Sequence, residues 1–158
     1  MRTLLISFSI LILHVSGHSQ ASSLPAPKPY FSAIIVSDIA ISIEWYTKNF
    51  GLEIVNQVEN SERGFKQANL KRGSTWLELL ELNNARSQSD LLANLPAKTK
   101  VEGYFKFGFT VSEFDEWIKF LTAVEVNLYG SVVEDPNSGK RMIIVLDPDG
   151  NRIQLFEE

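Results

Sequence analysis

The order of apolar and polar positions from residue 30 onward predicts a strand followed by an amphipathic helix. Residues 31–36 are apolar and β-branched enough for a strand, and Ser37 and Asp38 then supply side chains that commonly cap a helix N-terminus. Gly51 stands where a left-handed C-terminal cap is expected. Apolar residues recur at helical spacing between the two caps, namely Ile39, Ile43, Tyr46 and Phe50. The pattern predicts one helix of about three turns.

Three further segments have the composition of strands, and together with the first two elements they form a β-α-β-β-β unit. They are residues 52–59, 65–71 and 75–81, with residues 71–74 as the last hairpin turn. Residues 83–103 are polar except for an apolar patch at 91–95. This stretch predicts a linker that contains a short helix.

The first pattern then recurs, because residues 105–114 echo residues 30–39. Ser112 and Glu113 are expected to cap a second helix with the same chemistry as Ser37 and Asp38. The apolar face of that helix comprises Phe114, Trp117, Ile118 and Leu121, and strands follow at 127–133, 141–146 and 153–156. The chain is thus expected to be a duplicated module, with a pocket between two curved half-sheets.

The first 21 residues have the pattern of an export signal. Arg2 supplies a positive start, residues 4–15 are nearly all apolar, and residues 19–21 offer a cleavage site. The apolar run is shorter than the roughly 20 residues that a membrane-spanning helix needs, which favours a cleaved signal over an uncleaved anchor. Residues 22–29 are rich in proline and predict an extended tether. A periplasmic or extracellular location is expected, where glutathione is scarce.

Composition narrows the chemistry of the remaining chain. The 158 residues suffice for one domain, and the net charge of -4 with a pI near 5.3 argues against nucleic acid as a partner. There is no cysteine, and both histidines, His14 and His18, lie in the predicted signal. The mature protein would therefore lack a Ser-His-Asp triad, a cysteine nucleophile and imidazole or thiolate zinc ligands.

Several motifs in this order resemble the vicinal oxygen chelate superfamily, which includes glyoxalase I, extradiol dioxygenases and bleomycin-resistance proteins. The matching segments are 36–39, 45–46, 50–52, 76–79 and 147–155, the last reading Asp-Pro-Asp-Gly-Asn-Arg-Ile-Gln-Leu. The resemblance implies an α+β fold in which two tandem βαβββ modules form a curved mixed sheet around a central cavity. The domain would span residues 30–158, with module one at 30–82, the linker at 83–103 and module two at 104–158.

The resemblance also identifies four positions at which metal-dependent members bind their ion, usually through His, Gln or Glu. They correspond to Phe31, Glu78, Lys106 and Gln154. Phe31 cannot coordinate, Lys106 would repel a cation, and Gln154 is a weak donor, so we expect no metal cofactor. One hypothesis pairs the Lys106 ammonium with Glu78 in the place of the ion. The alternative is that both are ordinary charges on a strand face.

Strand alternation adds further residues to the inner face of the predicted cavity. They are Ala33, Ile35, Trp76, Leu80, Gly108, Thr110, Arg152 and Phe156. From these and the four former ligand positions, the predicted ligand-binding set is Phe31, Ile35, Trp76, Glu78, Lys106, Thr110 and Gln154. Trp76 and Phe156 are alternatively core residues. Asp147, Asp149 and Asn151 predict a turn rather than a calcium loop, and Arg141 is expected to be solvated.

Three functions follow from these expectations, in decreasing order of preference. The first is a protein that binds a small organic molecule in the inter-module cavity without a metal. The second is a glyoxalase-like lyase or isomerase with Glu78 as general base and Lys106 stabilising an oxyanion. The third is a metal enzyme with other ligands. No membrane partner is expected after signal cleavage, and a homodimer that exchanges modules is an open alternative to a monomer.

Overall fold

The computed structural model describes residues 29–158 except 97–98, 100–102, 104 and 137. The predicted signal at 1–21 and residues 22–28 of the predicted tether lie outside this part of the chain. No helix in the described part is both long and apolar enough to cross a membrane.

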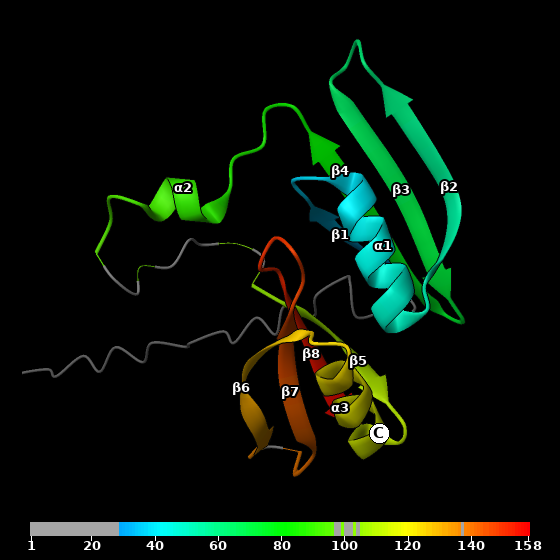
Figure 1. Cartoon of the computed structure of the whole chain (residues 1–158), viewed down its shortest axis with the longest axis vertical. Coiled ribbons are helices and arrows are strands. Elements are labelled where there is room, and N and C mark those ends of the chain that lie inside the picture. The colour runs from blue at the N-terminus through cyan, green and yellow to red at the C-terminus, as the bar shows by residue number, and fades with distance from the viewer. Residues whose placement is uncertain (1–28, 97–98, 100–102, 104, 137) are drawn as a thin grey trace, which may run out of the picture.

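Module one forms a four-stranded mixed sheet with one long helix. Its elements are β1 (Ser32–Ile35), α1 (Ile39–Phe50), β2 (Glu53–Asn60), β3 (Phe65–Arg72) and β4 (Thr75–Leu82). The strand order is β1-β4-β3-β2, with β1 parallel to β4 and the other pairs antiparallel. Figure 1 shows this module as the blue, cyan and green half of the molecule.

Module two repeats the arrangement after a linker that carries the short helix α2 (Gln88–Leu92). Its elements are β5 (Phe107–Val111), α3 (Phe114–Ala123), β6 (Asn127–Glu134), β7 (Arg141–Leu146) and β8 (Arg152–Glu157). The strand order β5-β8-β7-β6 matches that of module one, with β5 parallel to β8. The predicted fold class, α+β with two tandem βαβββ modules, is confirmed.

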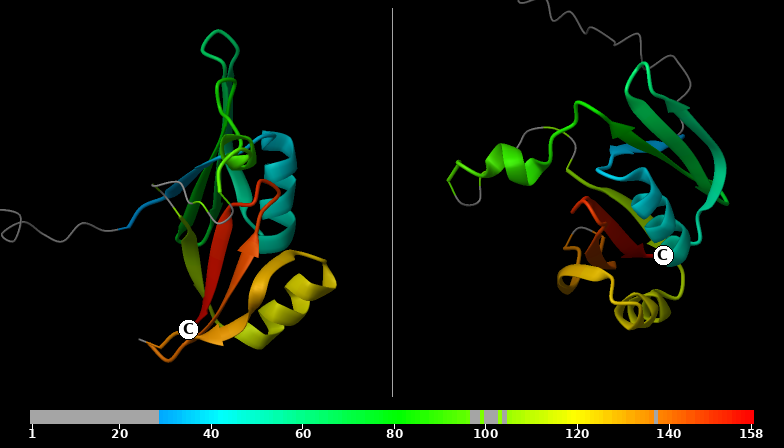
Figure 2. Two further views of the ribbon diagram at one scale, coloured as in Figure 1. Left: turned by 90° about the vertical axis from the view of Figure 1, so that its left-hand side faces the viewer. Right: turned by 45° about the horizontal axis from the view of Figure 1, so that its top comes forward.

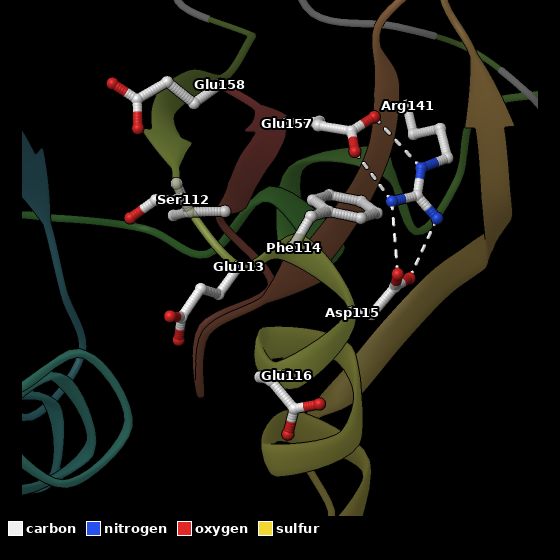
Figure 3. A pocket seen from close by; sticks show the side chains of 9 residues that line it. Ser112, Glu113, Phe114, Asp115, Glu116, Arg141, Glu157 and Glu158 are labelled. Atoms are coloured by element: carbon white, nitrogen blue, oxygen red, sulfur yellow. Dashed lines mark hydrogen bonds and ion pairs between the residues drawn. The ribbon is translucent and has the colours of Figure 1, made fainter.

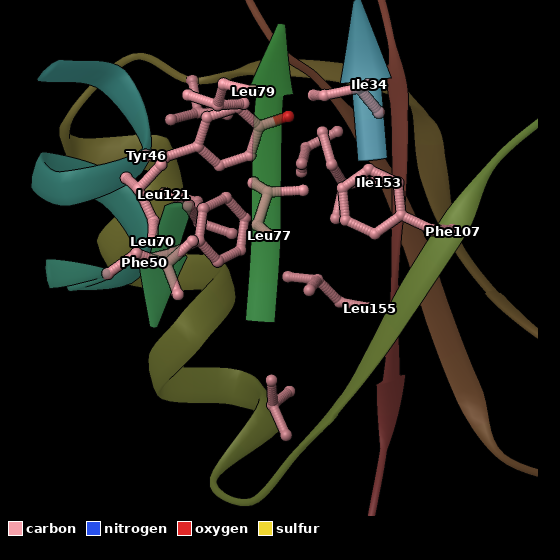
Figure 4. Close-up of a cluster of buried hydrophobic side chains, with 14 of the residues drawn as sticks. Ile34, Tyr46, Phe50, Leu70, Leu77, Leu79, Phe107, Leu121, Ile153 and Leu155 are labelled. Carbon is pink, nitrogen blue, oxygen red and sulfur yellow. The ribbon is translucent and has the colours of Figure 1, made fainter. Parts of the chain in front are cut away.

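One hydrophobic core serves both modules. Both long helices lie on the same side of the two sheets (Figure 2, left), and alternate strand residues point toward them. Phe50 at the end of α1 joins the modules, because its ring stacks on Trp117 of α3 with centroids 5.8 Å apart and lies 5.6 Å from Phe109 of β5. Figure 4 shows side chains from both modules meeting in this cluster.

The two helices begin differently, although their sequences predict the same caps. The carboxylate of Asp38 accepts hydrogen bonds from the backbone N–H groups of Ala40 and Ile41, as expected of an N-cap. Glu113 instead adopts a left-handed conformation with φ of 55° and makes no side-chain cap. The prediction of equal capping is therefore wrong, because the Glu113 backbone does not present its carboxylate to the first turn of α3.

The turn between β7 and β8 binds module two to α1. Asp147 accepts hydrogen bonds from the Asp149 and Asn151 backbone N–H groups, which confirms the predicted turn. Its second oxygen accepts from the hydroxyl of the fully buried Tyr46 at 2.9 Å, and Asp149 accepts from the Ser37 backbone N–H at 3.1 Å. Burial raises the pKa of Asp147 and of Tyr46. We refer to the Tyr46 and Asp147 pair as the latch.

Candidate functional site

The candidate site lies on the sides of the two sheets that are turned away from the helices, here called the free faces. In module one, Leu77 and Leu79 of β4 enter the core, so the alternate residues Trp76, Glu78 and Leu80 lie on the free face. The parallel register places Ala33 beside Glu78 and Ile35 beside Leu80. Strand pairing thus places the module-one half of the predicted cavity lining on one surface.

The free face of module two follows from the same alternation. Ile153 and Leu155 of β8 are buried in the core, which leaves Arg152, Gln154 and Phe156 on the free face. The register places Gly108 beside Gln154 and Thr110 beside Phe156. A Cβ atom on Gly108 would lie 2.7 Å from the Gln154 carbonyl oxygen, so glycine permits this close approach of β5 to β8.

Glu78 and Lys106 are not paired with each other in the single chain. The Glu78 carboxylate accepts a 2.5 Å hydrogen bond from the side-chain amide of Gln67 on β3. Lys106, just before β5, is exposed, and the described residues contain no ion pair within 4.0 Å that joins it to Glu78. The hypothesised ion pair is therefore not formed. Gln67 was not among the predicted site residues, although alternation along β3 would have placed it on this face.

The four former ligand positions do not fit a metal ion. Phe31 offers carbon atoms only, with 54% of its surface exposed, and Lys106 carries a positive charge. Gln154 is 3% exposed, and its side-chain amide donates to the sulfur of Met142. The carboxylate of Glu78 is the single strong ligand that remains. No group of three or more His, Cys, Asp or Glu residues suited to a metal occurs within the described ranges.

An apolar and aromatic surface surrounds Glu78 on module one. Trp76 is half-buried and contacts the ring of Tyr30, with centroids 6.1 Å apart, while the Lys71 ammonium lies 4.8 Å above the indole. Trp76 is therefore a free-face residue rather than a core residue. Phe31 and Ile35 are both exposed at the edge of this surface. Large apolar side chains left in contact with water commonly indicate a binding surface.

Arg152 on module two has aromatic neighbours but no carboxylate. Its guanidinium carbon lies 4.8 Å from the ring centroid of Phe105 and 5.0 Å from that of Tyr129. The buried Nε atom has no hydrogen-bond partner, and none of the four ion pairs in the described residues includes Arg152. The sequence placed Arg152 on the inner face but contained no indication of these two aromatic partners.

Arg141, expected to be solvated, is instead held by two carboxylates. Its guanidinium pairs with Asp115 at 2.8 Å and with Glu157 at 2.7 Å, and it lies 5.1 Å from the Phe114 ring centroid. Figure 3 shows these contacts at the start of α3. Arg141 lowers the pKa of Glu157 through the hydrogen bonds between them. The side chain is nevertheless 40% exposed, so the predicted solvation holds, while its two partners were not predicted because they lie on two other elements that β7 meets only in the folded chain.

The two pockets found in the structure lie away from the free faces. One, of about 680 Å³, is the acidic hollow at the start of α3 that contains Arg141 (Figure 3). The other, of about 490 Å³, lies between α1 and β2. Neither includes any of the seven predicted ligand-binding residues. In the single chain Phe31, Ile35, Lys106 and Thr110 are exposed, Trp76 and Glu78 are half-buried, and Gln154 is buried.

Comparison with known proteins identifies relatives over most of the chain. A sequence profile of the Glyoxalase/Bleomycin resistance protein/Dioxygenase superfamily matches residues 29–155. The Metallothiol transferase FosB of Staphylococcus haemolyticus is 30% identical over 122 residues, which are 76% of this chain and 76% of that protein. The trypanothione-dependent glyoxalase I of Leishmania major has a TM-score of 0.62 at 25% identity, over 84% of this chain and 88% of its own. A glyoxalase family protein from Enterococcus faecalis has a TM-score of 0.71 at 24% identity, over 82% and 97% of the two chains.

Proposed function

Because the chain belongs to the Glyoxalase/Bleomycin resistance protein/Dioxygenase superfamily, we propose that it binds a small organic molecule on its free faces without a metal ion. The observation that carries this proposal is the set of side chains at the former ligand positions. Phe31 and Lys106 cannot bind a cation, and the Glu78 carboxylate is already engaged by Gln67. The aromatic surface around Trp76 offers apolar contact area, and Thr110 adds an exposed polar group on module two.

Metal analysis of the purified protein tests this function, together with thermal denaturation in Zn²⁺, Ni²⁺, Mn²⁺ and Fe²⁺. We expect no stoichiometric metal and no increase in Tm with any of the four ions. A matched control is the triple variant F31H/K106H/Q154E, which restores the ligand types that the resemblance implies at these positions. Stoichiometric metal in the wild-type protein would refute metal-free binding.

The exposed free faces also support a homodimer. Phe31, Ile35 and Val58 on module one and Tyr129 on module two are large and exposed in the single chain. A second copy that brings module one of one chain opposite module two of the other would cover these side chains and enclose the site. Analytical ultracentrifugation tests this arrangement. We expect a dimer for the wild type and a shift toward monomer for the double variant I35E/Y129E, while a monomeric wild type would contradict it.

A lyase or isomerase function is the second candidate. The relatives include proteins named as a transferase and as glyoxalase I, and Gln67 fixes the Glu78 carboxylate on the open face, where it could act as a general base. In this scheme Lys106 stabilises the negative charge that develops on a carbonyl oxygen. The variant E78Q separates the two functions. An enzyme loses turnover of its carbonyl substrate in this variant, whereas a binder shows no turnover in either the wild type or the variant.

We further propose that the chain is exported to the periplasm or the extracellular space. The proposal rests on the pattern of residues 1–21 alone. Expression of the full chain, cell fractionation and N-terminal sequencing test it. A mature N-terminus near Ser22 is expected, and an uncleaved cytosolic product would contradict export.

A further inference from the structure

The guanidinium of Arg152 lies on the free face beside two aromatic rings and has no ion-pair partner among the described residues. Arg152 lies on β8, between β5 on one side and β7 and β6 on the other. Phe105, just before β5, and Tyr129 of β6 contact it from these two directions. Nε is buried without a partner, whereas the two Nη atoms make no hydrogen bond and are not among the buried atoms that lack one. The Nη edge of the guanidinium is therefore the part that remains open to solvent.

A partly buried guanidinium without hydrogen-bond partners is costly to maintain. A buried polar group without a partner destabilises the folded protein, and more so if it is charged. The two cation–π contacts offset part of this cost, but they leave the buried Nε–H without an acceptor. Arg141 in the same sheet shows the usual solution, because two carboxylates occupy its donors. Arg152 has the same fork of donors with no such groups opposite it.

We propose that Arg152 is the oxyanion-binding residue of this protein, and that its Nη atoms bind a carboxylate or phosphate group of the ligand. The inference rests on the proposed function, since it assumes that the free face binds a small molecule. The guanidinium fork matches two oxygens of one carboxylate or phosphate, which makes such contacts about twice as strong as neutral hydrogen bonds.

The two rings also indicate the rest of the ligand. Phe105 is 54% exposed and Tyr129 is 51% exposed, so each ring retains a large uncovered surface beside the guanidinium. An apolar body attached to the oxyanion would pack on these surfaces while the oxyanion binds Arg152. The ligand class is thus a small organic anion with a flat or ring-like apolar body. Lys106, two positions before Gly108 on the neighbouring chain segment, adds positive charge without an ion-pair partner in the described residues.

The experiment follows the arginine Nε–Hε signals of the full-length mature protein by NMR during titration with three probes. Benzoate and phenyl phosphate carry an oxyanion on a ring, and benzamide is the neutral match of benzoate. We expect both anions to shift the Arg152 signal and benzamide to leave it in place. Arg141 is an internal control, because its donors are already occupied by Asp115 and Glu157. The relative affinities of the two anions show whether the site prefers carboxylate or phosphate.

Substitution of Arg152 provides the second measurement. R152Q should weaken benzoate binding by about tenfold or more, since it removes a charge-assisted contact, and R152K should weaken it less. R63Q is the matched control, because it removes the same charge from the exposed turn between β2 and β3. If R152Q does not fold, the Arg152 signal in the wild type and the affinity of R152K decide the question.

Two results would overturn the proposal. One is equal binding of benzoate and benzamide, or a benzoate affinity that R152Q leaves unchanged. The other is an Arg152 signal that neither anion shifts at its solubility limit. If benzamide shifts the amide signals of Ile35 or Thr110 without involving Arg152, the free face still binds small molecules and only the oxyanion proposal fails. If the protein contains stoichiometric metal and the anions still shift the Arg152 signal, metal-free binding is refuted and the oxyanion proposal stands.

Discussion

The two modules share one fold, yet their free faces carry different chemistry. On module one the polar groups satisfy one another, because Gln67 donates to Glu78 and Asn69 donates to Asn56 at 2.8 Å. On module two the guanidinium of Arg152 contacts two aromatic rings and has no carboxylate partner in the described part of the chain. The helix sides of both sheets instead carry the apolar residues of the shared core. The comparison teaches that packing keeps the buried positions of the repeat alike, while solvent-facing positions can differ without loss of the fold.

The largest loss of stability should come from truncating Phe50, the side chain that joins the modules. Phe50→Ala leaves a cavity between α1 and module two, because the ring contacts both Phe109 and Trp117. We expect a loss of about 3–5 kcal/mol in the free energy of unfolding. Urea denaturation followed by tryptophan fluorescence and by circular dichroism measures it, and the two probes should coincide.

The control is Phe120→Ala, since this side chain is exposed and contacts the edge of Trp117. It should cost less than about 1 kcal/mol. Equal losses for the two variants would show that the modules do not share their core through Phe50.

Removing the hydrogen bond of the latch, between Tyr46 and Asp147, should cause the next largest loss of stability. Tyr46→Phe removes one donor from the buried Asp147 and should cost about 1–3 kcal/mol. Because the two side chains contact each other, the losses from Tyr46→Phe and Asp147→Asn should not be additive. A double-mutant cycle by chemical denaturation measures the coupling energy. Full additivity would mean that the latch does not hold α1 to module two.

Substitutions at the helix N-caps should change the stability in opposite directions in the two modules. Asp38→Ala removes the side chain that accepts from two backbone N–H groups, and should cost about 1 kcal/mol. Glu113→Gly relieves the left-handed conformation of a residue that makes no cap, and should gain about 0.5 kcal/mol after the entropy of glycine is subtracted. Thermal denaturation of the two variants checks both signs. A loss for Glu113→Gly would indicate a stabilising contact of its side chain.

The smallest effect should be a dependence of stability on pH, which has opposite signs for the carboxylates of Glu81 and Asp147. Lys66 and the Ile39 backbone N–H lower the pKa of Glu81, so the unfolded chain binds this proton more readily than the folded protein. The stability from Glu81 is therefore present above its ordinary pKa of 4.5 and is lost as the pH falls through the folded value. Asp147 has the opposite sign, because burial raises its pKa and its protonated form is favoured in the folded protein.

The Tm of wild type and of Glu81→Gln between about pH 7 and about pH 3 measures this dependence. The wild type should be the more stable of the two at neutral pH, and the difference should narrow in acid. A difference that is independent of pH would contradict the role of Glu81. The exposure of Lys66 keeps the expected effect small.

Much of the fold was predictable from local sequence. The Asp38 and Gly51 caps set the ends of α1, and apolar, β-branched composition identified the strands to within a residue or two. The motif at 147–155 correctly predicted a turn. The hydrogen bond from Tyr46 to Asp147 in that turn was not predictable, since these two residues lie 101 positions apart. The carboxylate partners of Arg141 were missed because they lie on other elements, 16 and 26 positions away. Gln67 lies only 11 positions from Glu78 on the neighbouring strand, and alternation would have placed it on the same face.

The sequence predicted which side of the sheets carries the candidate site, but not which side chains contact each other there. The family resemblance placed Glu78 and Gln154 on the inner face, and strand alternation counted from them added Thr110 and Arg152. Whether a carboxylate pairs with Lys106 or with Gln67 depends on strand register and on the paths of long side chains, which local sequence does not specify.

The sequence by itself determined the duplicated βαβββ fold and the superfamily, because both depend on residue type and spacing along the chain. Only the tertiary structure decided that Glu78 is engaged by Gln67, that Asp147 fastens module two to α1, and that Arg152 pairs with no carboxylate among the described residues. The physical reason is that these features depend on distances between side chains on different strands and helices. Such distances are set only when these elements have packed together.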